Sequence, residues 1–410
     1  MKWITTAAFA LWFCANTLAA TPHSTPIDSY GSQLSIPSKV LGEDRTLQVY
    51  LPEGYETSKR TYPVLVILDA DDYFLHGVTF QKTLKRFEKS PDFIVVGFNT
   101  HFRQRRALFG HQAATFSEFL STELMPYIEQ NYRISNQRIL FGWEMAGGMA
   151  SEVMAQTDLF SAYLMASPTH IDEERLEWVK TKVATYDKKG QSSPFLYVTQ
   201  AQGESFTNDL TSALNHVSPE GFDWQADTLQ DDDHHTTPYQ TIYQGLRCYF
   251  ADYPPLEFET MAEFNTYGGM KSLKAHYQAR GTRYDLPGEV HDRTQYALLM
   301  QSIREDNYAQ FDMFLGEFTF FTDELKFPGW AIGWSDFYLK HKKYLKAQNV
   351  LAKAIQQFPN AAMLYAAMGD TYVGLGQKEN ATKSFNKAIS LALKGNKRNL
   401  EVYQQKLKAL

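Results

Sequence analysis

Residues 138–150, RILFGWEMAGGMA, have the residue types and spacing best suited to catalysis in this sequence. An apolar run leads into a turn that contains a glycine, and a segment of small residues follows. A strand that turns into a helix in this way is typical of a nucleophile elbow, where a hydrolase presents its attacking serine. Glu144 stands where that serine is expected. The segment therefore predicts a hydrolase with an unusual elbow group or a hydrolase fold that has lost this chemistry.

Two further polar groups follow in the chain order of a catalytic triad. The loop QAQGES after an apolar run offers Glu204, and the loop DDDHHTTPY offers His234. The order elbow, acid, histidine is that of α/β-hydrolases. Asp209 or one of Asp231–Asp233 could supply the acid instead. The clustered aspartates and histidines could also bind a metal, but only a loop pattern indicates this, so we expect no metal and no cofactor.

The elements that must position these groups follow from hydropathy. From residue 63 onward the apolar runs are nearly continuous, which is typical of strands buried on both faces. Between them lie helical patterns, the clearest at residues 114–132, where the apolar side chains share one face. The alternation predicts an α/β fold, with a mostly parallel sheet and helices on both faces. Strands are expected at residues 46–51, 63–68, 93–98, 138–142, 162–167 and 194–199.

The N-terminal residues 1–20 have the pattern of a secretory signal peptide. Lys2 precedes an apolar stretch, and small residues at 18–20 provide a cleavage site. We therefore expect a periplasmic or secreted protein with no membrane span after cleavage, an uncleaved anchor being the alternative. Cys248 is then the only cysteine, so no internal disulfide is expected. The net charge of −6 comes without a basic stripe, which argues against nucleic-acid binding.

Beyond residue 255 the strand patterns stop. Residues 256–327 are expected to form a helical connector, and residues 328–410 two TPR-like repeats closed by a capping helix. An ordinary pair of helical hairpins is the alternative. Two repeats are few for a free-standing array, so we expect them to pack on the preceding domain and to offer a surface to a protein partner. The repeat shows in Tyr338 and Tyr372, Ala347 and Ala381, Leu351 and Phe385, and Ala354 and Ala388.

Three segments, RTLQVYLPEGYETSKRTYPVLVILDADDYF, ELMPYIEQNYRISNQRILFG and DHHTTPYQTIYQGLR, resemble the putative-esterase family of α/β-hydrolases. This family includes enterochelin-esterase-like and esterase D-like enzymes. The resemblance covers roughly residues 30–252, and LKAHYQARGTRYDLP is similar to the C-terminal segment of some members. It implies an α/β-hydrolase domain at residues 21–255, a Ser–acid–His triad with a G-H-S-x-G-G elbow, and a small-molecule ester as substrate.

Carried over to this chain, the resemblance shows three departures at the elbow. Trp143 replaces the family's histidine, Glu144 its serine, and Ala146 the first of its two glycines. In the family, the catalytic histidine is followed by a small residue, by Ser or Thr, and by Pro. This pattern favours His234 over His235 as the catalytic histidine. Trp143 is expected to contact the substrate.

The resemblance also implies an oxyanion hole and a substrate-binding loop. The backbone N–H groups would come from Met145 and from the loop LDADD, near Asp71. The acidic side chains of this loop oppose an anion unless they point away. The loop NTHFRQRRALFGH carries Arg103, Arg105 and Arg106, which would recognise an anionic or polar substrate, or would otherwise form a solvated basic loop. Arg103 and Arg106 are the expected substrate contacts.

A glutamate at the elbow changes the chemistry that is available. Attack of a carboxylate on an ester gives a mixed anhydride, which lies uphill of the ester. Loss of a triad serine costs about 10⁶ in turnover and leaves about 10³ to 10⁴ over water. Glu144 could instead attack a saturated carbon, polarise water, or form an ion pair with protonated His234. We therefore expect weak or altered esterase activity, with an inactive, ligand- or partner-binding protein as the alternative.

Overall fold

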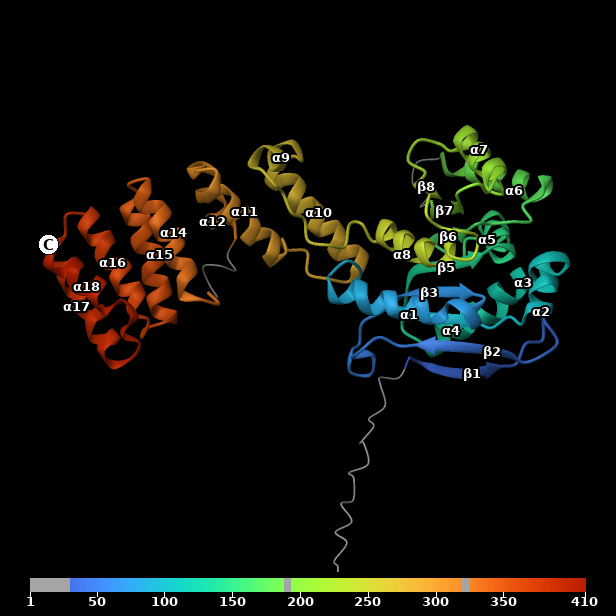
Figure 1. The fold of residues 1–410 in the computed structure, drawn as a ribbon, viewed down its shortest axis with the longest axis horizontal. Coiled ribbons are helices and arrows are strands. Elements are labelled where there is room, and N and C mark those ends of the chain that lie inside the picture. The colour runs from blue at the N-terminus through green and yellow to red at the C-terminus, as the bar shows by residue number, and fades with distance from the viewer. Residues whose placement is uncertain (1–29, 188–192, 319–324) are drawn as a thin grey trace, which may run out of the picture.

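The computed structural model describes residues 30–187, 193–318 and 325–410. The predicted signal peptide lies outside these residues. Figure 1 shows an α/β domain built on one sheet, followed by an arm of helices that leads away from it to the C-terminus. Within the described ranges, no helix is both long enough and apolar enough to cross a membrane.

In the part of the chain that the structure describes, the sheet has eight strands in the order β1-β2-β4-β3-β5-β6-β7-β8. The pairs β1–β2 and β2–β4 are antiparallel, and all the other pairs are parallel. The predicted α/β-hydrolase fold with a mostly parallel sheet is therefore confirmed. The strands are β1 (Ser32–Ile36), β2 (Arg45–Tyr50), β3 (Tyr62–Leu68), β4 (Ile94–Phe98), β5 (Ile134–Trp143), β6 (Ala162–Ala166), β7 (Phe195–Ala201) and β8 (Trp224–Leu229).

All six predicted strands are present, and two edge strands were not predicted. β1 reads SQLSI and β8 reads WQADTL, and most of their residues are at least partly exposed. Such mixed sequences lack the continuous apolar run of an interior strand. β3 and β4, by contrast, are buried along their whole length. Burial on both faces therefore explains which strands the sequence could predict.

Helices cover both faces of the sheet. One core contains buried residues from α3 to α6, among them Phe116, Met149 and Val179, and the other contains Phe74 from α1 and Ile242 from α8. The helix predicted at 114–132 is divided by a π-helical segment, η3. The helices are α1 (Ala70–Arg86), α2 (Phe102–Arg106), η2 (Ala107–His111), α3 (Ala113–Phe119), η3 (Leu120–Leu124), α4 (Met125–Asn131), α5 (Met145–Gln156), α6 (Glu173–Ala184), α7 (Asn208–Val217) and α8 (Thr237–Tyr249), with short 3₁₀ turns η1 (Tyr55–Thr57) and η4 (Thr185–Asp187).

The arm is a stack of helices that share one core from Met261 to Met368, so the connector and the first repeat are packed together. In the described residues of the arm, three helix pairs follow one another, starting at residues 292 and 308, 328 and 344, and 362 and 378. The arm comprises α9 (Met261–Thr266), α10 (Gly269–Tyr284), α11 (Asp292–Arg304), α12 (Tyr308–Glu317), α14 (Pro328–Lys340), α15 (Tyr344–Gln357), α16 (Ala362–Gly374), α17 (Lys378–Lys394), the turn η5 (Lys397–Asn399) and α18 (Leu400–Lys408).

The repeats were expected to pack on the α/β domain, and this expectation was wrong. They pack on the connector helices, and the connector meets the domain through α10 (Figure 1). Gln137 at the start of β5 donates to the backbone oxygen of Arg283 at 2.8 Å, and Tyr284 belongs to the core of the domain. The repeats bury their apolar faces against the connector because it continues the same stack of helix pairs.

Candidate active site

The register of the sheet brings several polar residues to its carboxyl edge. Ile67 of β3 lies opposite Phe141 of β5, and Ala166 of β6 lies opposite Trp143. Residues that follow these strands therefore meet at one edge, as expected for parallel strands. Asp69, Glu144 and Ser167 are three such residues.

Glu144 occupies a sharp turn between β5 and α5. Its backbone has φ 52° and ψ −115°, a strained conformation for a residue with a side chain. The turn is held by hydrogen bonds: its N–H donates to Ala166 O at 2.9 Å, and its carbonyl oxygen accepts from Gly148 and Thr169, both at 3.0 Å. This is the geometry of a nucleophile elbow.

The elbow also requires glycine at position 142. A Cβ atom there would lie 2.2 Å from the carbonyl oxygen of Ala146, closer than any side chain allows. Ala146 itself is fully buried, so the close strand–helix packing accommodates this departure from the family pattern. Met145 is the first residue of α5. Its backbone N–H therefore has no acceptor within the helix.

The carboxylate of Glu144 is paired with Arg105. Nη1 of Arg105 donates to Oε2 of Glu144, Nη2 donates to the backbone oxygen of Trp143 at 2.7 Å, and Nε lies 2.9 Å from both carboxylate oxygens of Asp69. Arg105 is buried, at 8% exposure. Burial lowers the pKa of Arg105, but attraction to Asp69 and the hydrogen bonds to both carboxylates outweigh it and raise this pKa. Arg105 is therefore a buried cation that these contacts hold next to the elbow.

The acidic loop after β3 is engaged within the protein. Asp69 is buried, and its Oδ1 accepts from Thr100 Oγ1 at 2.6 Å. Burial raises the pKa of Asp69, against the opposing effect of Arg105. Asp71, in the first turn of α1, accepts from the Asn99 side chain at 2.6 Å and from Thr100 N–H at 3.0 Å. These two carboxylates are therefore turned toward protein donors.

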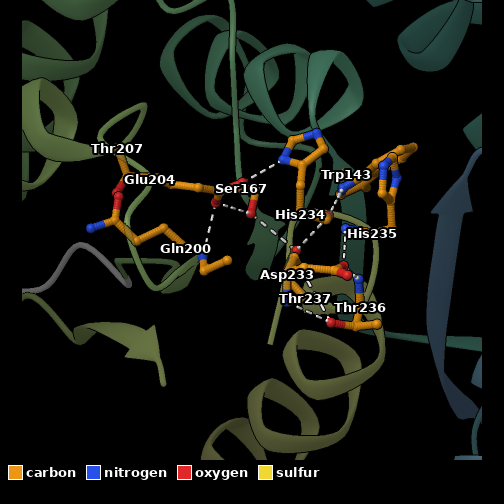
Figure 2. Close-up of polar contacts among 11 residues, drawn as sticks. Trp143, Ser167, Gln200, Glu204, Thr207, Asp233, His234, His235, Thr236 and Thr237 are labelled. Atoms are coloured by element: carbon orange, nitrogen blue, oxygen red, sulfur yellow. Dashed lines mark hydrogen bonds and ion pairs between the residues drawn. The ribbon is translucent and has the colours of Figure 1, made fainter. Parts of the chain in front are cut away.

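His234 and Glu204 lie together, as Figure 2 shows. Nδ1 of His234 is 2.6 Å from Oε1 of Glu204. The other oxygen of Glu204 accepts from Ser167 Oγ at 2.7 Å and from Ala201 N–H at 2.8 Å. Within the described residues, Nε2 of His234 makes no hydrogen bond. A carboxylate on Nδ1 with Nε2 open is the arrangement that a general base requires.

The alternative acids have other positions. Asp233 accepts from the backbone N–H groups of His235 at 2.8 Å and Thr236 at 3.1 Å, so it caps the turn before α8. These hydrogen bonds lower the pKa of Asp233, and the one from His235 has the largest effect. Glu204, not Asp233, is thus the carboxylate on the ring of His234. No group of three or more His, Cys, Asp or Glu side chains in the described parts of the chain is arranged to hold a metal.

Trp143 connects the elbow to the histidine loop. Its Nε1 donates to the backbone oxygen of His234 at 2.9 Å, and the two rings are 5.2 Å apart (Figure 2). The guanidinium of Arg105 lies 5.1 Å from the centre of the indole ring. Trp143 therefore has a structural role at the elbow, and its expected contact with substrate stays a prediction.

One sequence-based expectation differs from the structure. The ion pair expected between Glu144 and protonated His234 is replaced by an ion pair between Glu144 and Arg105, because Arg105 is a permanent cation that also bonds the backbone oxygen of Trp143 at the elbow. Arg105 is the arginine of α2 that contacts the elbow, whereas Arg103 and Arg106 are exposed, and their expected contact with a substrate stays a prediction. Ser167 was also missed, and its position at the end of the run 162–167 was the available signal.

Comparison with known proteins agrees with this geometry. Residues 38–228 match the family described as putative esterase. This match covers most of the α/β domain, which is therefore similar to the putative-esterase family. Residues 363–394 match a tetratricopeptide repeat. The uncharacterized protein YjcH of Bacillus subtilis is 26% identical over 222 residues, which cover 50% of this chain and 90% of that protein.

Two solved structures share the fold of this chain. An IroE-like serine hydrolase from Shewanella oneidensis superposes with a TM-score of 0.52 at 21% identity, and covers 70% of this chain and 98% of its own. An uncharacterised protein from Capnocytophaga ochracea superposes with a TM-score of 0.52 at 19% identity, over 87% of this chain and 93% of its own. At these identities the likeness concerns the fold.

Proposed function

We propose that this esterase-family domain has lost serine-type turnover and binds a small ester-type molecule, or a related ligand, without hydrolysing it efficiently. One observation carries the proposal: the side chain at the elbow is a carboxylate, and a buried arginine holds it. A carboxylate that attacks an ester forms a mixed anhydride, and an ion pair with Arg105 lowers its reactivity further. Triad-serine removal costs about 10⁶ in turnover.

The retained histidine supports a second candidate function, slow hydrolysis by activated water. His234 has Glu204 on Nδ1 and no partner on Nε2 among the described residues. It could accept a proton from water that attacks a bound ester. Without a covalent intermediate, we expect at most about 10³ to 10⁴ over the uncatalysed rate.

The two candidates are separated by hydrolysis of short-chain nitrophenyl esters. We expect turnover near background in the native protein and a large increase in Glu144→Ser, because the backbone at 144 already has the elbow geometry. The matched control is Glu144→Ser combined with His234→Ala, which should return to background. Native turnover that His234→Ala abolishes and Glu144→Ala leaves unchanged would favour the water mechanism. A folded but inactive Glu144→Ser protein would contradict an intact supporting site.

Export and partner binding are further parts of the proposal. The signal-peptide pattern of residues 1–20 supports a periplasmic or secreted location. The tetratricopeptide match at 363–394 supports a protein partner for the arm. Fractionation of expressing cells tests the proposed location. Recovery of the full-length chain in the cytoplasm would contradict export.

A further inference from the structure

A cavity of about 750 Å³ lies between Tyr253, at the end of the α/β domain, and the first helices of the arm. Its walls come from Tyr253 after α8, from α10, from the loop between α10 and α11, and from the ends of α11 and α12. The segment LKAHYQARGTRYDLP contributes to its walls, and this segment has no part in the chemistry at the elbow. The cavity is therefore separate from the site around Glu144.

Arg280 of α10 lines this cavity and is only 7% exposed. Its Nε donates to the backbone oxygen of Tyr253 at 2.7 Å. Its guanidinium lies 4.9 Å from the ring centre of Tyr253 and 5.7 Å from that of Tyr277. In the described ranges of the chain, Nη1 and Nη2 have no acceptor and Arg280 has no carboxylate partner. An arginine offers five N–H donors, so those on Nη1 and Nη2, which have no protein partner here, are available to a ligand in the cavity.

Gln295 adds an unused acceptor to the same wall. Its Nε2 donates to the backbone oxygen of Val290 at 2.5 Å, while its Oε1 is buried without a partner among the described residues. A ligand that fits both groups has an anionic end for Arg280 and an O–H or N–H group for Gln295.

The acidic residues that also line the cavity do not neutralise Arg280. Glu317 pairs with Lys274 at 2.6 Å, Asp292 lies 3.9 Å from Lys326, and Glu289 is exposed. They stand at the rim, whereas Arg280 is inside. A buried cation without a counter-charge is costly, and a bound anion would offset this cost.

We propose that this cavity binds a small carboxylate or phosphate, with Arg280 as the main contact. The planar fork of an arginine side chain matches two oxygens of either group. The two flanking tyrosine rings fix the plane of the guanidinium and so prepare it for this geometry. This site is independent of the proposed function of the elbow.

The test is isothermal titration of the full chain with sodium phosphate and, separately, with sodium acetate, at constant ionic strength. We expect saturable binding of at least one anion, and the comparison shows which group the site prefers. Arg280→Met should weaken this binding about tenfold or more. The matched control is Arg293→Met, because Arg293 is an exposed arginine of the neighbouring α11 with surface partners.

Arg280→Lys is a second variant in case Arg280→Met does not fold. It keeps the positive charge but lacks the planar pair of donors of the guanidinium. It should be folded by circular dichroism and bind more weakly than the native chain. The absence of saturable binding of both anions by the native chain would overturn the proposal. Unchanged affinity in both folded Arg280 variants, or equal weakening in Arg293→Met, would also overturn it.

Discussion

Replacement of Arg105 by methionine should strongly destabilise the α/β domain. Arg105 bonds both oxygens of Asp69, whose side chain is 4% exposed, and also holds Glu144 at the elbow. Removal of one partner of a buried ion pair typically costs about 3–5 kcal/mol, because the remaining charge is left uncompensated. We therefore expect a loss of this size in the free energy of unfolding of the domain.

The assay is urea unfolding followed by far-UV circular dichroism. The arm has its own core, so separate transitions must be fitted. With a slope of about 3 kcal/mol per molar urea, the midpoint of the domain should fall by about 1 M or more. Arg103→Met is the matched control, since Arg103 is exposed on the same short helix, and its midpoint should stay close to native.

Acid should reduce the defect of Arg105→Met. Burial raises the pKa of Asp69 above its ordinary value of 3.8, and loss of the arginine should raise it further. The folded state then binds a proton more readily than the unfolded state, so its stability increases as the pH falls toward 3.8. The double variant Asp69→Asn with Arg105→Met should recover most of the loss. A midpoint for Arg105→Met equal to that of Arg103→Met would refute the reasoning.

Two further substitutions test packing and charge. Gly142→Ala places a Cβ 2.2 Å from the carbonyl oxygen of Ala146 and should cost about 3 kcal/mol or more, whereas Gly333→Ala, in α14 with open space around it, should stabilise by about 0.5–1 kcal/mol. Equal urea midpoints for these two variants would contradict the tight elbow. Although burial opposes it, hydrogen bonds from Ser38 and from backbone N–H groups lower the pKa of Glu123 below 4.5. Its contribution to stability is therefore present above pH 4.5 and lost as the pH falls through the lowered value, so native and Glu123→Gln midpoints should differ at neutral pH and converge in acid. A constant difference would exclude this linkage.

The interior strands of the sheet were predictable because residues that are buried on both faces of a sheet are almost all apolar. β3 and β4 are buried throughout, so their sequences are continuously apolar. The chain order of Glu144, Glu204 and His234 was likewise predictable, from loops after strands together with the resemblance to the putative-esterase family. The edge strands β1 and β8 escaped because a strand exposed on one side carries polar residues.

The contacts of the site were less predictable because they depend on register and helix phase. Arg103, Arg105 and Arg106 share one short helix, and only the backbone geometry decides that the second faces the elbow. Ser167 reaches Glu204 because β6 ends beside β5 and β7, a relation between distant segments. Pairwise contacts of this kind have no signature in a single sequence.

The most direct test of the central claim is labelling with a fluorophosphonate, read out by mass spectrometry of the intact chain and its peptides. Such a probe modifies an activated serine hydroxyl but should leave a carboxylate held by Arg105 unmodified. We expect no adduct at position 144 in the native protein, an adduct there in Glu144→Ser, and its loss when His234→Ala is added. Stoichiometric labelling of the native chain, on any hydroxyl beside His234, would contradict the account.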